Sequence, residues 1–218
     1  MKISACRSCN SNKLEKCLSL GKQALTGVFP PDTKQKITTG NLSLVFCKNC
    51  TLLQLSENFD RAEMYGSNYG YESSLNPTMV NHLKTKAEML QKLTNFSHGD
   101  IVVDIGSNDG TFLSFFNKKL SLIGIDPTIS KFKNKYNKNI IKIFNFFSEN
   151  LLKKYFLKKK AKLITSIAMF YDLENPLSFA KEIYNSLDDN GVWHFEQSYM
   201  PSMIKNTSYD TICHEHLE

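Results

Sequence analysis

The chain has 218 residues, of which 41% are hydrophobic, and it carries a formal net charge of +6. This length and apolar content are enough to bury the core of one large or two small domains. No apolar run approaches the roughly eighteen residues of a membrane span, and the amino terminus lacks the apolar region of a signal peptide. The sequence therefore predicts a cytoplasmic protein with no membrane partner.

Two Cys-x-x-Cys pairs stand near the amino terminus, Cys6 with Cys9 and Cys47 with Cys50. Each pair can present two thiolates from one tight turn, and two such turns complete a tetrahedral zinc site. The alternative is four ordinary buried thiols. Because four thiolates fill the coordination shell and leave no position for water, the predicted zinc is structural. We expect a small β-rich zinc-binding domain over residues 1–57.

A different composition follows over residues 58–98. The apolar run 42–46 leads into the second cysteine pair as a predicted strand, whereas residues 65–74 are rich in tyrosine and glycine and read as a loop. Beyond that loop, apolar residues recur at helical spacing and predict a helix that begins after Pro77. Tyrosines of the loop either pack on a neighbouring domain or hydrogen-bond a polar substrate, and both interpretations stay open.

Residues 101–105 are continuously apolar apart from one aspartate, as a buried parallel strand is, and they run into a glycine-containing turn and a predicted helix at Thr111. A dinucleotide-binding fingerprint has the pattern G-x-G-x-x-G. Here only Gly106 and Gly110 are present, and Asn108 and Asp109 lie between them. Acidic groups repel a pyrophosphate but suit the ammonium and sulfonium of S-adenosylmethionine. The predicted cofactor-binding residues of this stretch are Asp104, Gly106, Asn108, Asp109 and Gly110.

Further strands and helices alternate along residues 99–218. The predicted strands cover 122–126, 140–143, 163–166 and 192–196, with a helix over 178–187 and a turn at 188–191. This alternation predicts an α/β fold with a doubly wound, parallel, Rossmann-like sheet whose ligand lies over the strand ends. Asp126 is placed to accept hydrogen bonds from a ribose, and the residues expected near the adenine are Asn145, Phe146 and Phe147.

At this point the sequence resembles a known family. The stretches "VVDIGSNDGTFL", "GIDPT", "FYDLENP", "FEQSYMPS" and "YDTICHEHLE", together with the four cysteines, are similar to S-adenosylmethionine-dependent C-methyltransferases that carry an amino-terminal zinc-binding domain. The resemblance covers essentially the whole chain. It implies a class I methyltransferase sheet and a small-molecule acceptor, because the best-described members methylate a carbon of a nucleotide-linked keto-deoxysugar.

The resemblance also implies roles for the terminal motif. His216 is the candidate base that removes a proton from the carbon next to a ketone, and Glu215 orients the imidazole or holds the substrate. The resulting enolate needs hydrogen-bond donors, for which Tyr69 and Tyr71 are the candidates. A metal site formed by His214 and His216, an ordinary core histidine and an unordered tail are the alternatives.

One departure from the family concerns the segment after the fourth strand. The described sugar enzymes have an active-site histidine there, whereas this chain has Tyr171 and Asp172, which either take over its role or accompany a different acceptor. A methyltransferase sheet usually has two more strands than the five predicted, and the family adds a further domain. We therefore expect the domain over 99–218 to be incomplete.

Two other functions are considered. An RNA methyltransferase would suit the zinc module and the lysine-rich segments 131–138 and 153–160, although both segments fit solvated faces of predicted helices. The Asn/Asp-Pro-Pro-aromatic turn of amino-group methyltransferases is missing, so we expect no nucleic-acid partner. The remaining alternative is a non-catalytic module that binds zinc and S-adenosylmethionine.

Overall fold

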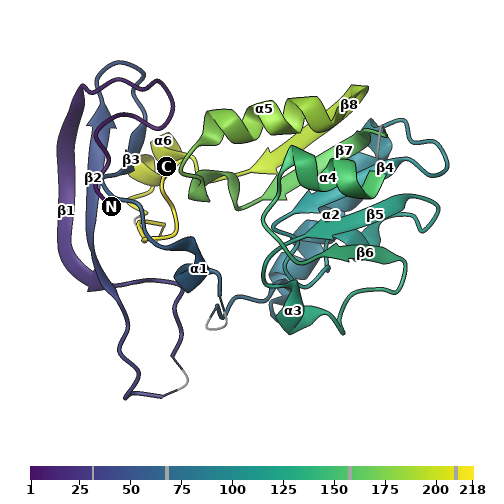
Figure 1. Cartoon of the computed structure of the whole chain (residues 1–218), viewed down its shortest axis with the longest axis horizontal. Coiled ribbons are helices and arrows are strands. Elements are labelled where there is room, and N and C mark those ends of the chain that lie inside the picture. Colours follow the sequence, from purple (N-terminus) through teal and green to yellow (C-terminus); the bar gives the residue numbers. More distant parts are fainter. Residues whose placement is uncertain (31, 67–68, 157–158, 209–210) are drawn as a thin grey trace. The chain divides into compact units, whose positions relative to one another are not determined.

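The computed structural model describes residues 1–30, 32–66, 69–156, 159–208 and 211–218. Parts of the predicted loop 65–74, of the lysine-rich segment 153–160 and of the terminal motif 209–218 lie outside the described residues. The chain divides into two units, one formed by Met1–Gly70, Phe170–Phe179 and Gln197–Glu218, and the other by Tyr71–Met169 and Ala180–Glu196 (Figure 1). The boundaries predicted at residues 57 and 98 stay a prediction.

The second unit, here called the sheet unit, is built on a five-stranded parallel sheet in the order β6-β5-β4-β7-β8. The sequence prediction of a parallel Rossmann-like sheet is therefore confirmed. Every residue of the central strand β4 is buried, which explains its almost continuous apolar sequence. The strands are β4 (Ile101–Ile105), β5 (Ser121–Ile125), β6 (Ile140–Ile143), β7 (Ala161–Ile167) and β8 (Leu187–Glu196).

Helix α2 (Pro77–Leu93) covers one face of this sheet, and α4 (Glu149–Phe156) is drawn on the opposite side (Figure 1). The Asn76 side chain caps α2 by accepting from two backbone N–H groups, and proline occupies its first turn. Leu83, Ala87 and Leu90 of α2 pack into the core with residues of β4, β5 and β7. Among the described residues, no helix is long and apolar enough to cross a membrane.

Three local predictions were wrong. The helix expected at Thr111 is only a short 3-10 turn, η2 (Leu113–Phe115), because the Ser114 hydroxyl bonds the Thr111 carbonyl and β5 begins soon afterwards. The lysine-rich segment 131–138 is helical only at its start, in α3 (Ile129–Phe132). The turn predicted at 188–191 lies within β8 as an irregularity of the strand pairing.

The first unit, here called the zinc unit, contains the antiparallel sheet β1-β2-β3. Its elements are β1 (Leu14–Ala24), β2 (Thr39–Cys47), β3 (Leu53–Leu55), α1 (Arg61–Met64), η3 (Phe170–Asp172) and α6 (Met200–Lys205). The carboxyl-terminal segment lies against β3, where the Leu55 N–H donates to the Leu217 carbonyl at 2.9 Å. Leu217 is buried with Leu42, Leu44 and Leu55, so this segment completes the core of the zinc unit.

Two further helical elements precede α2 and β8. The 3-10 turn η1 (Ser73–Leu75) precedes α2 in the sheet unit, and α5 (Pro176–Ser186) precedes β8. The observed α5 agrees with the helix predicted over 178–187.

Candidate active site and metal centre

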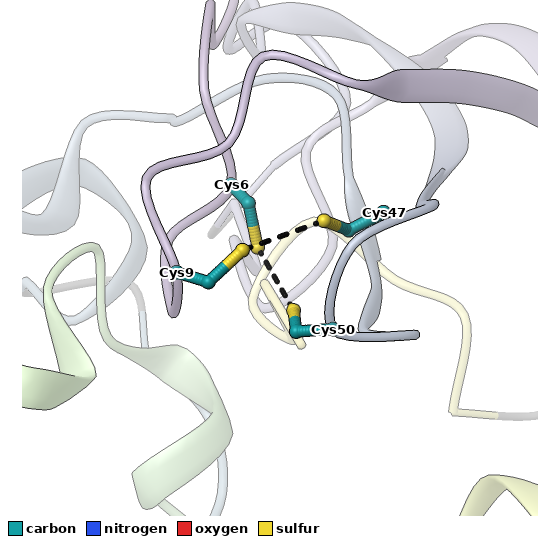
Figure 2. Close-up of side chains that lie close together, drawn as sticks. All are labelled: Cys6, Cys9, Cys47 and Cys50. Atoms are coloured by element: carbon teal, nitrogen blue, oxygen red, sulfur yellow. Dashed lines mark hydrogen bonds between the residues drawn. The ribbon is translucent and has the colours of Figure 1, made fainter.

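The four predicted metal ligands converge in the zinc unit (Figure 2). The Sγ atoms of Cys6, Cys9, Cys47 and Cys50 all lie within 4.8 Å of one another. Two pairs, Cys6 with Cys50 and Cys9 with Cys47, are 3.6 Å apart. A tetrahedral ion with Zn–S bonds of about 2.3 Å requires S–S separations of roughly 3.8 Å. The donor set therefore fits a structural zinc ion.

The pKa values of two thiols in this cluster are shifted in opposite directions. The Asn49 side-chain amide and a backbone N–H lower the pKa of Cys9 to about 6. Cys50 behaves in the opposite way: although a backbone N–H from Leu52 favours its thiolate, burial and the neighbouring sulfurs raise its pKa to about 12. Four thiolates at this spacing repel one another, so full ionisation of the cluster requires a cation.

In the sheet unit, three residues of the loop after β4 have a left-handed backbone conformation. Gly106, Asn108 and Gly110 have φ angles of +73°, +49° and +78°. A Cβ on Gly110 would lie 2.7 Å from the ring of Tyr136, whose hydroxyl donates to the Asn108 carbonyl. Gly110 is thus needed for packing, while Gly106 is needed for its left-handed backbone. The loop forms a backbone cradle at the carboxyl end of the central strand.

Two buried carboxyl groups, those of Asp104 and Asp126, lie near this loop. Asp104, within β4, accepts a hydrogen bond from the Thr165 hydroxyl at 2.7 Å, yet burial and the charge of Asp126 raise its pKa to about 7. Asp126 follows β5, and its two oxygens accept from the Asn108 N–H and from the N–H and hydroxyl of Thr128. The resulting negative potential suits a cationic ligand and disfavours a pyrophosphate, as the sequence predicted.

The remaining predicted cofactor residues divide into two groups. The side chains of Asn108 and Asp109 accept from the backbone N–H groups of Ser73 and Ser74, and Asn108 also donates to the Tyr71 carbonyl. They therefore fasten the segment before α2 to the loop. The second group follows β6, next to β5 in the same parallel sheet, and consists of Asn145, Phe146 and Phe147. All the predicted cofactor residues thus lie on adjacent strands or at their carboxyl ends.

The predicted base lies in the zinc unit. The Nδ1 atom of His216 is 2.8 Å from the Thr211 carbonyl and must donate to it, which leaves Nε2 as the unprotonated nitrogen of the neutral ring. The ring packs against Tyr171 with centroids 4.4 Å apart. Burial lowers the pKa of His216, with the Thr211 carbonyl acting in the opposite direction. The imidazole is therefore held neutral, with one nitrogen able to accept a proton.

Acidic groups surround this histidine, and with it they form what we call the His216 cluster, made of Tyr65, Asp172, Cys213, Glu215 and His216. Burial raises the pKa values of Glu215 and, more strongly, of Asp172, whose negative neighbour Glu215 adds to the effect. Burial likewise raises the pKa of Cys213 to about 11. Burial therefore shifts the acidic groups of the cluster toward their protonated forms.

Two polar atoms of the cluster lack a partner. The Tyr65 hydroxyl lies beside the Asp172 carboxyl group, but neither this hydroxyl nor Asp172 Oδ1 makes a hydrogen bond of good geometry within the described part of the chain. Both atoms are buried. Buried polar groups are normally satisfied, and their lack of partners is typical of a site that binds a polar ligand.

A glycine in the zinc unit leaves space for the Glu215 carboxylate. Gly27 has a φ angle of +78°, and a Cβ at this position would lie 1.7 Å from Glu215 Oε1. The adjacent Thr26 hydroxyl accepts from the His214 N–H at 2.8 Å. Thr26 and Gly27 together seat the terminal motif on the zinc unit.

His214 and the two predicted catalytic tyrosines have different positions. His214 is fully buried, and its two ring nitrogens contact the Gly40 carbonyl and the Thr26 N–H, so it packs inside the zinc unit rather than pairing with His216 at a metal. Tyr69 lies beside Tyr65, with ring centroids 5.6 Å apart, and so reaches the edge of the His216 cluster. Tyr71 belongs to the sheet unit.

Cys213, Glu215 and His216 also offer three ligand atoms within 4.8 Å of one another. One nitrogen of His216 is engaged by Thr211, and the pKa of the Cys213 thiol is raised.

Two family models match the chain. Residues 6–65, which include all four cysteines, match the model described as "Putative zinc binding domain", and residues 56–218 match the model described as "Methyltransferase domain". The second match covers most of the sequence. The chain belongs to the methyltransferase-domain family.

A curated relative of this methyltransferase-family chain is C-methyltransferase NovU of Streptomyces niveus, which is 24% identical over 221 residues. The match covers 98% of this chain and 52% of NovU, so the chain spans about half the length of that relative. Among solved structures, the plantazolicin methyltransferase BpumL in complex with S-adenosylhomocysteine gives a TM-score of 0.47 at 20% identity, covering 61% of this chain and 52% of BpumL. Coclaurine N-methyltransferase gives 0.42 at 13% identity, covering 58% and 38%.

Several residues of the candidate site in this methyltransferase-family chain escaped the sequence analysis. The sequence marks Tyr65 only as one of the loop tyrosines that could pack or hydrogen-bond a substrate, and it gives Thr211 and Gly27 no role at the site. The glycine itself was the only available signal for Gly27, because a left-handed backbone favours that residue. Nothing local in the sequence indicates that the Thr211 carbonyl, rather than Glu215, contacts the imidazole.

Proposed function

We propose that this chain binds the cofactor and removes the proton in S-adenosylmethionine-dependent C-methylation. The acceptor would be the carbon next to a ketone in a nucleotide-linked deoxysugar or a similar small polar molecule. The observation that carries the proposal is the state of His216, a half-buried imidazole whose Nδ1 donates to Thr211 and whose Nε2 has a lone pair when the ring is neutral. The relative NovU is a C-methyltransferase, which favours a carbon acceptor over the RNA alternative.

The sheet unit supplies the residues that would hold the cofactor. The loop that contains Gly106 lies at the carboxyl end of the central strand. Asp126, which three hydrogen-bond donors hold in place, is the group proposed to bind a ribose hydroxyl pair. The negative potential of Asp104 and Asp126 favours an ammonium and a sulfonium. When bound, S-adenosylmethionine supplies an electrophilic methyl group and leaves as S-adenosylhomocysteine.

The zinc unit supplies the acid-base groups. Nε2 of His216 takes the proton from the carbon next to the ketone, and the electron pair of the broken C–H bond moves onto the carbonyl oxygen as an enolate. That carbon then becomes the nucleophile for the methyl group. Imidazole is a much weaker base than an enolate, and each unit of pKa mismatch costs about 1.4 kcal/mol, so the oxygen must receive hydrogen bonds.

Donors for this oxygen are available in the His216 cluster. Burial raises the pKa values of Asp172 and Glu215, which shifts each carboxyl group toward the protonated form that can donate, and the Tyr65 hydroxyl is a further donor. Asp172 would thereby take the place of the histidine that the described sugar enzymes have after the fourth strand. Tyr69 and Tyr71 remain the other proposed donors.

Deuterium exchange tests the proton-removal step without the methyl donor. A nucleotide-linked keto-deoxysugar is incubated with the chain in D₂O, and proton NMR follows the signal of the carbon next to the ketone. We expect catalysed exchange with the unmodified chain and with the control His98→Ala, whose side chain is exposed in the sheet unit. His216→Ala should reduce the exchange rate by about 100-fold or more. Equal exchange by both variants would contradict the assignment of the base.

Cofactor binding is tested separately by calorimetric titration with S-adenosylhomocysteine. We expect binding that His216→Ala leaves unchanged and that Asp126→Ala weakens. Zinc content measured on the same sample should be about one ion per chain.

A further inference from the structure

The second residue of each Cys-x-x-Cys turn is basic, but the two side chains have opposite environments. Lys48, in the second turn, is exposed and pairs only with Glu15 among the described residues. Arg7, in the first turn, is only 7% exposed. A buried guanidinium is costly unless its N–H groups are used, so the environment of Arg7 calls for a specific explanation.

The Arg7 guanidinium is bound by the backbone carbonyls of three residues and by two side-chain oxygens, while its Nε has no hydrogen-bond partner within the described part of the chain. Nη1 donates to the carbonyls of Leu55 at 2.7 Å and Leu217 at 3.2 Å, and Nη2 donates to the carbonyl of Glu57 at 3.2 Å and to the Asn58 side chain. Leu217 is separated from Arg7 by 210 residues in the sequence. Arg7 therefore fastens the carboxyl-terminal segment to β3.

A buried glutamine connects Arg7 to the cysteine cluster. Gln54 is 1% exposed, its Nε2 donates to the Cys6 sulfur at 3.2 Å, and its Oε1 accepts from the Arg7 N–H at 3.1 Å and from Nη1 at 3.3 Å. A sulfur that ligates a metal is a thiolate, which accepts this hydrogen bond more strongly than a thiol does. The orientation of Gln54, and through it of Arg7, thus depends on the state of Cys6.

The segment that Arg7 fastens carries the proposed base. Leu217 follows His216 directly, and its N–H donates to the Tyr171 carbonyl at 2.8 Å, while the Tyr171 ring packs on the imidazole of His216. Displacing the Leu217 carbonyl would therefore move both His216 and the Tyr171 ring that packs on it. A continuous set of contacts runs from Cys6 through Gln54, Arg7 and Leu217 to the histidine.

We propose that Arg7 is a positioning residue, which makes the orientation of His216 dependent on the metal in the four-cysteine site. The catalytic consequence rests on the proposed function, but the structural coupling does not. The zinc ion then has a role beyond stabilising its own domain, since its loss disturbs a proton-accepting group that it does not touch.

The test compares Arg7→Met with the matched control Lys48→Met, both loaded with zinc and checked for metal content. Long-range ¹H–¹⁵N NMR reports which ring nitrogen of His216 carries the proton and the pKa of the ring. We expect the unmodified chain and Lys48→Met to show a neutral ring protonated at Nδ1. Arg7→Met should lose that preference, and its His216 pKa should rise toward the ordinary value near 6.5. An unchanged ring in a zinc-loaded Arg7→Met chain would overturn the proposal.

Chelation provides a second measurement in case Arg7→Met does not fold. Removing zinc from the unmodified chain should change the His216 spectrum in the same way, and restoring zinc should reverse the change. If the variant folds, chelation should produce little additional change in it. An imidazole spectrum that is insensitive to zinc removal would also refute the coupling.

Methyl transfer distinguishes this proposal from the proposed function. With both correct, Arg7→Met lowers kcat by about tenfold or more and changes the KM for S-adenosylmethionine little, because misplacement of a reacting group acts on the chemical step. If the His216 ring responds to Arg7→Met and kcat does not, the positioning role stands and the assignment of His216 as the base fails.

Discussion

Replacing Asp104 with asparagine should stabilise the sheet unit increasingly as the pH rises. The Asp104 carboxyl has a pKa of about 7 in the folded chain, against 3.8 for an unperturbed group, because it is buried next to Asp126. Between these two values the folded chain binds more protons than the unfolded chain, so its free energy of unfolding falls as pH increases. Asparagine removes this dependence while still accepting from Thr165.

The magnitude follows from the size of the shift. A difference of roughly three pKa units corresponds to a destabilisation of about 4 kcal/mol once the group is fully ionised, above pH 7. Between pH 5.5 and pH 7 the loss is about 1.4 kcal/mol per unit, or about 2 kcal/mol in all. The difference in unfolding free energy between the variant and the parent should therefore grow by about 2 kcal/mol from pH 5.5 to pH 8.

The single tryptophan makes this measurable for the sheet unit alone. Trp193 lies in β8, and its indole N–H donates to the Ser166 hydroxyl at 2.9 Å, so its fluorescence reports urea unfolding of that unit. The control Asp189→Asn removes a carboxylate from an exposed position of the same strand. A gain for Asp104→Asn that is equal at pH 5.5 and pH 8 would refute the reasoning, because it would not arise from ionisation.

Four further predictions concern the zinc and the candidate site. Removing the metal with a strong chelator should make the four clustered cysteines available to a thiol reagent, and an unchanged thiol count would contradict a metal site. Gly27→Ala should lower the free energy of thermal unfolding of the zinc unit by more than Gly21→Ala does. Both glycines have φ near +75°, but only a Cβ at Gly27 meets Glu215. Equal losses of about 1–3 kcal/mol would mean that backbone strain alone is responsible. Asp126→Ala leaves three hydrogen-bond donors without their acceptor and should lower the free energy of urea unfolding by at least about 2 kcal/mol. A smaller loss would mean that water takes over the role of the carboxylate as acceptor. Because burial lowers the pKa of His216, the deuterium-exchange rate should stay constant as the pH falls to 6.5 and should decline only at lower pH. A pH–rate profile with its midpoint above pH 6.5 would argue against this base.

Short-range regularities of the sequence identified much of the molecule. The spacing of the two cysteine pairs predicted the metal centre, because two residues between thiols is a constraint of local geometry. The apolar run 101–105 predicted the central strand, since a strand buried on both faces needs apolar residues at successive positions. The acidic residues that follow β4 and β5 indicated a site at the carboxyl ends of parallel strands, where neighbouring strand ends must meet.

Tertiary contacts decided what those residues do. The side chains of Asn108 and Asp109, which are predicted cofactor-binding residues, accept hydrogen bonds from the segment before α2. The imidazole of His216 is oriented by the Thr211 carbonyl, and Arg7 reaches Leu217 across 210 residues. Such contacts depend on which backbone groups the completed fold brings together, and backbone carbonyls carry no mark in the sequence. The sequence by itself determined which chemical groups this protein possesses and where its strands run, whereas only the tertiary structure decided their partners, because hydrogen bonds and burial depend on distance in space.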